Sequence, residues 1–179
     1  MKTINVPTAE QVSPESQEIF AQLTKRLGKV PNLYATIGYS GNALKGFLDF
    51  EATLNKGSFS AKEREAIALV VSEVNHCAYC SAAHTQAALK FRFTLEETLD
   101  FRRGTATDDK LRAIVQLAKA ITETKGHPDA ALVDNFYAAG FNEASLIELI
   151  GLVTVRIFTN YVFAATQIPV DYPAASELV

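Results

Sequence analysis

Both cysteines of the chain lie in one short segment, Glu73–His84, together with two of its three histidines. On a helix, Cys80 lies three residues after Cys77 and His84 lies four residues after Cys80. The two sulfurs and the imidazole would therefore share one face, with neighbouring Cβ atoms about 5–6 Å apart. The spacing predicts a dithiol with a base beside it, and a Cys77–Cys80 disulfide in the oxidised protein.

Three other roles for the cysteine pair are weaker. A structural zinc site usually needs four protein ligands, and the chain has no second cysteine pair. A purely structural disulfide that closes so small a loop contributes only about 2 kcal/mol in the chain-entropy model. Two unconnected buried cysteines would not explain His84 on the same face. We therefore interpret the segment as a redox-active dithiol.

The position of the pair on its helix gives a reason for reactivity. Asn75 is a good N-cap for a helix over residues 76–91, so Cys77 is expected in the first turn, where free N–H groups and the helix dipole favour a thiolate. Cysteines in such positions titrate at roughly 3.5–7.5 instead of about 8.5. Tyr79 is interpreted as a wall of the site, and His76 as either a surface residue or a second base.

Composition limits the class of protein. The 179 residues are 48% hydrophobic, enough for one sizeable domain or two tightly fused halves. With 17 basic and 20 acidic residues and no basic cluster, nothing indicates a nucleic-acid partner. The first ten residues contain no apolar stretch typical of a signal peptide, so the expected location is the cytoplasm. A CxxC pair in that reducing compartment is more often catalytic or metal-binding than structural.

Helical patterns run through almost the whole chain and predict an all-α fold. Capping boxes at Ser60 and Thr94 mark two helix starts, Gly28 is placed to end an early helix, and Asn142 precedes a long apolar one. We expect a single domain over 1–179, made of N-terminal helices (1–58), a CxxC core (60–104) and a second half (107–167).

Two segments allow another interpretation. The β-branched run at 67–71 could be a strand leading into CxxC, as in thioredoxin, but the surrounding helical patterns leave no room for that fold's other strands. The run at 144–165 is long enough to span a bilayer, yet Glu148, Arg156 and Asn160 interrupt it. A buried or interface helix, and no membrane partner, is the better prediction.

A faint internal repeat relates Glu65–Val70 to Glu148–Val153. Extending this alignment pairs Asn160 with Cys77 and Gln167 with His84. A second copy of the repeat would therefore lack the cysteine and the histidine. Such a repeat predicts two related helical hairpins about a pseudo-twofold axis.

The sequence closely resembles the alkylhydroperoxidase D-like, carboxymuconolactone decarboxylase family, and in particular its peroxidase-related branch. The core of the resemblance is a glutamate, Glu65, followed twelve residues later by Cys77 of a CxYC motif and then by His84. Weaker similarity extends over residues 28–34 and 158–161. The resemblance implies an AhpD-like helical fold, assembly into homotrimers or homohexamers, and no metal, flavin or haem cofactor.

The resemblance also implies roles for the residues. Cys80 would attack a peroxide and become a sulfenic acid, Cys77 would resolve it to a disulfide, and His84 with Glu65 would relay protons. Helix position alone favours Cys77 as the more acidic thiol, so the order of attack stays open. Glu73, four residues before Cys77, is a rival carboxylate partner.

The expected function is thiol-dependent reduction of a small-molecule hydroperoxide, with an unidentified thiol or dithiol as reductant. One alternative is a cofactor-independent decarboxylase, although that branch characteristically lacks the cysteine pair. The other is a non-catalytic oligomer whose dithiol senses oxidants or binds metal weakly.

Overall fold

The computed structural model describes residues 4–178, which form helices joined by short loops and contain no strand. The elements are η1 (Ala9–Gln11), α1 (Pro14–Leu27), α2 (Asn32–Ile37), α3 (Gly41–Leu54), α4 (Ala61–Val74), α5 (Ala78–Lys90), α6 (Leu95–Arg103), α7 (Asp109–Glu123), α8 (Ala130–Ala138) and α9 (Glu143–Thr166). The predicted all-α class is confirmed. The thioredoxin alternative is wrong, because the run at 67–71 lies inside α4.

Local sequence signals set several helix ends as predicted. At the start of α4, the Ser60 side chain accepts the Glu63 N–H, and the Glu63 carboxylate accepts the Ser60 N–H in return. Thr94 and Glu97 form the same capping box at α6. Gly28 ends α1 with φ of 81°, a left-handed conformation that costs glycine little because it has no Cβ.

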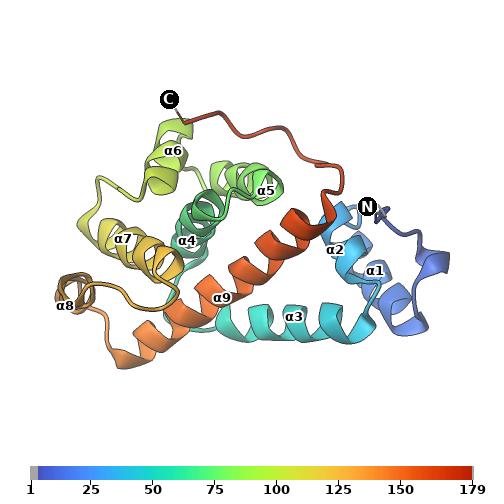
Figure 1. Ribbon diagram of the computed structural model, residues 1–179, viewed down its shortest axis with the longest axis horizontal. Helices are drawn as coiled ribbons and strands as arrows, with labels where there is room; N and C mark the ends of the chain where they lie inside the picture. The colour runs from blue at the N-terminus through green and yellow to red at the C-terminus, as the bar shows by residue number, and fades with distance from the viewer. Residues whose placement is uncertain (1–3, 179) are drawn as a thin grey trace.

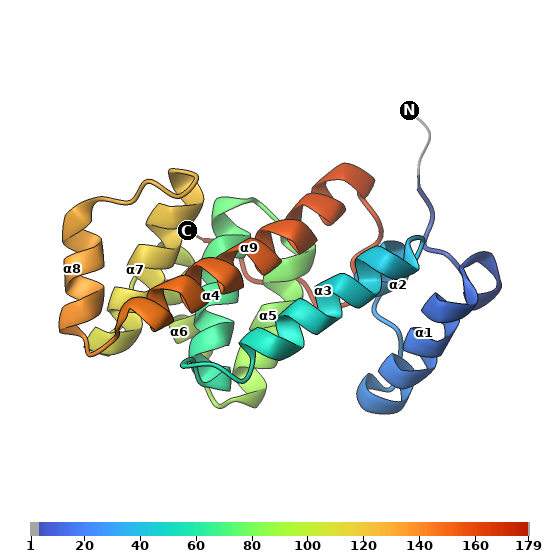
Figure 2. The same cartoon turned by 90° about the horizontal axis from the view of Figure 1, so that it is seen from below.

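Helix α4 lies at the centre of the molecule and packs against α5, α6, α7 and α9 (Figure 1). Helices α1 and α2 form one end, and α7 and α8 the other (Figure 2). The larger hydrophobic cluster surrounds α4, α7 and α9, whereas a second cluster joins α1, α2 and α3 to the start of α5. Cys77, Tyr79 and Cys80 belong to the second cluster, so the cysteine pair lies where the N-terminal helices meet the central ones.

The expected start of the cysteine helix was wrong. Asn75 ends α4 instead of opening α5, and the N-cap of α5 is Cys77 itself. The chain turns between the two helices at His76, which has φ of 52°. The Asn75 amide donates to the Val71 carbonyl and to Asn160 Oδ1 on α9, each at 3.0 Å. The Asn75 side chain therefore links α4 to α9 and is not available as the N-cap of α5.

Helix α9 is long and apolar enough to cross a membrane by length and composition, which alone is weak evidence. It packs instead against α3, α4 and α7, and its polar residues Arg156 and Asn160 are buried. The expected second hairpin is also not found at the register of the repeat. Where α4 ends and the chain turns toward α5, α9 continues without a break to Thr166.

Candidate active site

The two cysteines sit at the N-terminal end of α5 and are joined as a disulfide, with Cα atoms 5.3 Å apart. Both side chains are buried, at 1% and 2% exposure. Cys77 Sγ accepts the backbone N–H of Cys80 at 3.2 Å. In the reduced protein this N–H and the positive end of the helix dipole would favour a thiolate on Cys77.

His84 and Glu65 form a contact between α5 and α4. His84 Nδ1 lies 2.8 Å from Glu65 Oε2, and both side chains are less than one-fifth exposed. Burial opposes ionisation of Glu65, but the charge and hydrogen bond of His84, together with the charges of Arg156 and Arg64, outweigh it, so the pKa of Glu65 lies below its usual value. The carboxylate can therefore orient the imidazole.

Cys80, His84 and Glu65 line one cavity of about 370 Å³. Residues from the N-terminal helices and from α9 complete its walls, including Tyr34, Glu51, Arg156 and Thr159. The structure thus brings together three of the four sequence-predicted site residues around one cavity. The fourth, Cys77, does not line this cavity.

The sequence analysis did not predict a buried ion pair that lines the same cavity. Arg156 Nη1 of α9 lies 2.6 Å from Glu51 Oε1 of α3, and both side chains are largely buried. Burial works against the charge of Arg156, yet Glu51, Tyr34 and Glu65 together raise its pKa, so the arginine stays charged. Burial, reinforced by Glu51, also raises the pKa of the Tyr34 hydroxyl. The sequence signal that could have indicated this pair was Arg156, a single arginine within an apolar helix.

The rival carboxylate Glu73 is occupied elsewhere. Its Oε2 accepts Arg102 Nε of α6 at 2.8 Å, on the side of α5 away from the first cavity. Glu65 is therefore the carboxylate that contacts His84. Within residues 4–178, no three His, Cys, Asp or Glu side chains form a set that could hold a metal ion.

Comparison with known proteins agrees with this geometry. Residues 41–123, which include Glu65 and the whole CxYC segment, match the profile of the carboxymuconolactone decarboxylase family. The similarity to that family therefore covers this segment, a little under half of the chain. No curated protein is detectably similar to the chain in sequence.

Solved structures share the fold over most of the chain. An uncharacterized peroxidase-related protein from Silicibacter sp. TM1040 is 24% identical, with 98% of this chain and 93% of that chain covered and a TM-score of 0.79. An alkylhydroperoxidase AhpD core protein from Ralstonia eutropha JMP134, also described as peroxidase-related, is 17% identical, with coverage of 91% and 88% and a TM-score of 0.81. The debrominase Bmp8 in complex with 2,3,4-tribromopyrrole is 19% identical, with coverage of 96% and 93% and a TM-score of 0.79. The fold is therefore AhpD-like, as expected.

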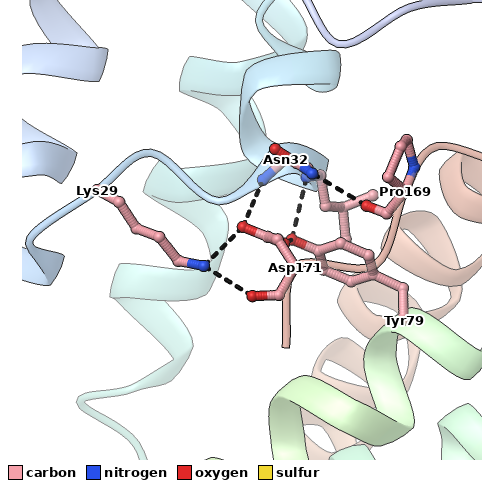
Figure 3. Close-up of polar contacts among 6 residues, drawn as sticks. Lys29, Asn32, Tyr79, Pro169 and Asp171 are labelled. Carbon is pink, nitrogen blue, oxygen red and sulfur yellow. Dashed lines mark hydrogen bonds and ion pairs between the residues drawn. The ribbon is translucent and has the colours of Figure 1, made fainter. Parts of the chain in front are cut away.

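The segment after α9 lines a cavity together with Cys77. It runs from the end of α9 over α5 toward α6 (Figure 1). Asp171 anchors it: one carboxylate oxygen accepts Lys29 Nζ at 2.7 Å, and the other accepts the Tyr79 hydroxyl at 2.5 Å (Figure 3). The Tyr79 oxygen in turn accepts the Leu33 N–H at 3.2 Å. Tyr79, between the two cysteines, is thus a structural wall, as the sequence predicts.

A second cavity of about 540 Å³ lies beneath this C-terminal segment. Cys77 and His76 line it, together with the Glu73–Arg102 pair. Tyr172 lines both cavities and packs edge-on against Tyr79, with ring centroids 5.6 Å apart. The two cysteines therefore line different cavities, which share Tyr172 as a common wall residue.

Proposed function

We propose that the protein is a thiol-dependent peroxidase that reduces a hydroperoxide through a Cys77–Cys80 dithiol–disulfide cycle. The observation that carries this proposal is the shared cavity of Cys80, His84 and Glu65, with His84 held by the carboxylate at 2.8 Å. A nucleophile, a base and an orienting group are then within one space large enough for a small molecule. The peroxidase-related descriptions of two similar structures support the same reaction class.

In the first step, the Cys80 thiolate attacks the outer oxygen of the hydroperoxide. An S–O bond forms, the O–O bond breaks, and the alkoxide leaves with the electron pair. His84, oriented by Glu65, supplies the proton that it took from the Cys80 thiol and so converts the alkoxide to an alcohol. Cys80 is now a sulfenic acid, which condenses readily with a neighbouring thiol.

In the second step, the Cys77 thiolate attacks Cys80 Sγ. The S–S bond forms, the S–O bond breaks, and hydroxide leaves as water after gaining a proton. Two thiols and one hydroperoxide thus give one disulfide, one alcohol and one water. Stabilisation of the Cys77 thiolate by the Cys80 N–H suits this resolving role.

The test separates the two cysteines. Reduced wild-type protein, Cys80→Ser and Cys77→Ser are mixed with cumene hydroperoxide, and peroxide loss is followed together with dimedone labelling of sulfenic acid. We expect wild-type protein to form the disulfide, Cys77→Ser to accumulate a sulfenic acid on Cys80, and Cys80→Ser to consume almost no peroxide. Sulfenic acid on Cys77 in Cys80→Ser, at the wild-type rate, would reverse the order of attack.

The same variants distinguish the alternatives from the sequence. A cofactor-independent decarboxylase would use no dithiol, so both serine variants would keep its activity. A non-catalytic sensor would be oxidised by peroxide too slowly to raise the rate of peroxide loss above that of dithiothreitol alone. Continuous peroxide consumption by the wild-type protein with excess dithiothreitol is the result expected for a peroxidase.

A second candidate reaction is reductive debromination of an aromatic compound. The observations that favour it are the structural similarity to the debrominase Bmp8 and the aromatic residues of the first cavity, Tyr34, Phe91 and Tyr172. The electron balance is the same: a C–Br bond is replaced by C–H, bromide leaves, and the dithiol becomes a disulfide. Bromide release from 2,3,4-tribromopyrrole with dithiothreitol tests it, and peroxide turnover without bromide release would exclude it.

A further inference from the structure

We propose that the second cavity is the entry site for the thiol reductant, which attacks Cys77 Sγ and reopens the disulfide. The inference rests on the proposed function, since a peroxidase must be reduced after each turnover. The key observation is that Cys80 lines the cavity of the proton relay, whereas Cys77 lines the cavity under the C-terminal segment. Substrate and reductant then reach the same disulfide from two different cavities.

The geometry of thiol–disulfide exchange favours this direction. The attacking sulfur approaches along the S–S axis, from the side opposite the sulfur that leaves. An attack on Cys77 from the second cavity therefore expels Cys80 Sγ toward the first cavity, which His84 lines. The small residues Ala78 and Ser81 line the second cavity beside Cys77 and leave room for the incoming sulfur.

The electrons and protons balance in two steps. The thiolate of the donor forms a mixed disulfide with Cys77, the Cys77–Cys80 bond breaks, and Cys80 leaves as a thiolate that can take a proton from His84. A second donor thiolate then attacks the donor sulfur of the mixed disulfide. Cys77 leaves as a thiolate, and the donor departs as a disulfide.

His76 lies at this second cavity and is exposed to solvent. Its backbone is held in the left-handed region, where its own N–H donates to the Glu73 carbonyl at 2.9 Å and the next N–H donates to the Ser72 carbonyl at 2.9 Å. Histidine adopts this region more readily than most residues. The imidazole is thereby placed at the approach to Cys77, where it can accept a proton from the incoming thiol.

The roof of the second cavity is suited to opening. It consists of Val170, Tyr172 and Ala174–Glu177, which belong to no helix. Polar contacts hold it: Asp171 to Lys29 and Tyr79, and the Ser176 carbonyl to Arg102 Nη1 at 2.5 Å. Opening this roof breaks a few hydrogen bonds and leaves the helical core intact, so local release costs less than unfolding.

The test measures the two half-reactions separately in a matched pair of variants. Ala78→Trp adds bulk on α5 at the second cavity, and Ala87→Trp adds the same bulk on α5 at the first cavity. Protein oxidised with diamide is reduced with dithiothreitol, and reduced protein is oxidised with cumene hydroperoxide. We expect Ala78→Trp to slow only reduction and Ala87→Trp to slow only oxidation, each by about tenfold or more, since misplacing reacting atoms by 1 Å can cost on the order of 10²-fold.

Two further measurements test the entry site independently of the tryptophan variants. Arg102→Gln, which loosens the roof, should accelerate reduction, and circular dichroism should show unchanged helix content. Brief treatment of the oxidised protein with 2-mercaptoethanol, acid quenching and peptide mapping should place the mixed disulfide on Cys77. An adduct on Cys80, or reduction of Ala78→Trp at the wild-type rate, would overturn the inference.

Failure of the proposed function gives a different pattern. If hydroperoxide does not oxidise the wild-type dithiol, the peroxidase proposal is wrong, but reduction of the diamide-formed disulfide still tests where a thiol enters. Suppose instead that hydroperoxide forms the disulfide and that Ala87→Trp slows reduction as strongly as Ala78→Trp does. The peroxidase proposal then stands, and the proposal that the reductant enters through the second cavity is wrong.

Discussion

His84 Nδ1 lies 2.8 Å from Glu65 Oε2, although the two residues are 19 positions apart on different helices. A carboxylate at Nδ1 favours the tautomer with the hydrogen on that nitrogen, which leaves Nε2 as the free base. His84 also lines the cavity that Cys80 lines. The pair therefore provides a base whose orientation is fixed from one helix and whose working nitrogen is available to the site.

The first prediction concerns this relay. His84→Ala and Glu65→Gln should each slow peroxide reduction, because positioned acid–base groups typically contribute about 10²–10⁴-fold. Single-turnover oxidation of the reduced protein measures the effect. The double variant should be scarcely slower than the poorer single variant, because the two residues act as a unit.

Glu73→Gln is the matched control for the carboxylate. Glu73 contacts Arg102 and not His84, so its amide variant should oxidise at nearly the wild-type rate. If Glu65→Gln kept full activity while Glu73→Gln lost it, the carboxylate would be wrongly assigned.

The second prediction concerns pH and stability. Burial raises the pKa of Glu65, but the charge and hydrogen bond of His84 and the charges of Arg156 and Arg64 outweigh it, so the pKa lies below its ordinary value of 4.5. A depressed folded-state pKa means that ionised Glu65 stabilises the fold above about pH 4.5, and that this stabilisation is lost as the pH falls through the lower folded value. Urea unfolding should therefore show wild-type protein more stable than Glu65→Gln near neutral pH, with the difference shrinking under strongly acidic conditions. A constant difference across that range would contradict the assignment.

The third prediction concerns the anchor of the C-terminal segment. Tyr79→Phe removes the hydroxyl that donates to Asp171 and accepts the Leu33 N–H. Hydrogen bonds to charged groups contribute about 1.5–3 kcal/mol, so the free energy of unfolding should fall by about 2 kcal/mol. Tyr39→Phe, at an exposed tyrosine, is the control and should change stability by less than about 0.5 kcal/mol. If the two substitutions lowered the free energy of unfolding equally, the Asp171–Tyr79 hydrogen bond would not be an anchor of the C-terminal segment.

The fourth prediction concerns assembly. One side of α9 and the adjacent part of α3 expose large apolar side chains, with Ile147 at 68% and Tyr161 at 60% exposure beside Ile150, Phe158 and Phe50. Contiguous apolar surface of this kind is typical of a protein interface. Light scattering should therefore give a mass several times the 19.5 kDa chain, consistent with a homotrimer or homohexamer.

Paired substitutions locate that interface. Ile150→Glu should dissociate the oligomer, whereas Leu95→Glu, at a similarly exposed leucine on α6, should not. A monomer for the wild-type protein at micromolar concentration, or equal dissociation by both variants, would contradict the prediction.

The sequence by itself determined the features that depend on nearby residues. The helix starts at Ser60 and Thr94 follow from side chains that bond backbone groups three residues away. The placement of His84 one turn after Cys80 follows from helical geometry alone, whereas Cys77 is the N-cap of α5 and does not line the cavity that Cys80 and His84 share. Asn75 was misassigned because asparagine can serve either end of a helix, and its amide is bound to Asn160, 85 positions later.

Only the tertiary structure decided which distant groups meet. Spacing did not exclude Glu73 as a rival to Glu65. The packing of α4 against α5 and α6 places Glu65 against His84 and Glu73 against Arg102. The Glu51–Arg156 pair and the separate cavities of the two cysteines likewise arise where α3, α9 and the C-terminal segment converge. Contacts between segments far apart in the chain depend on the relative placement of whole helices, and local spacing contains no information about that placement.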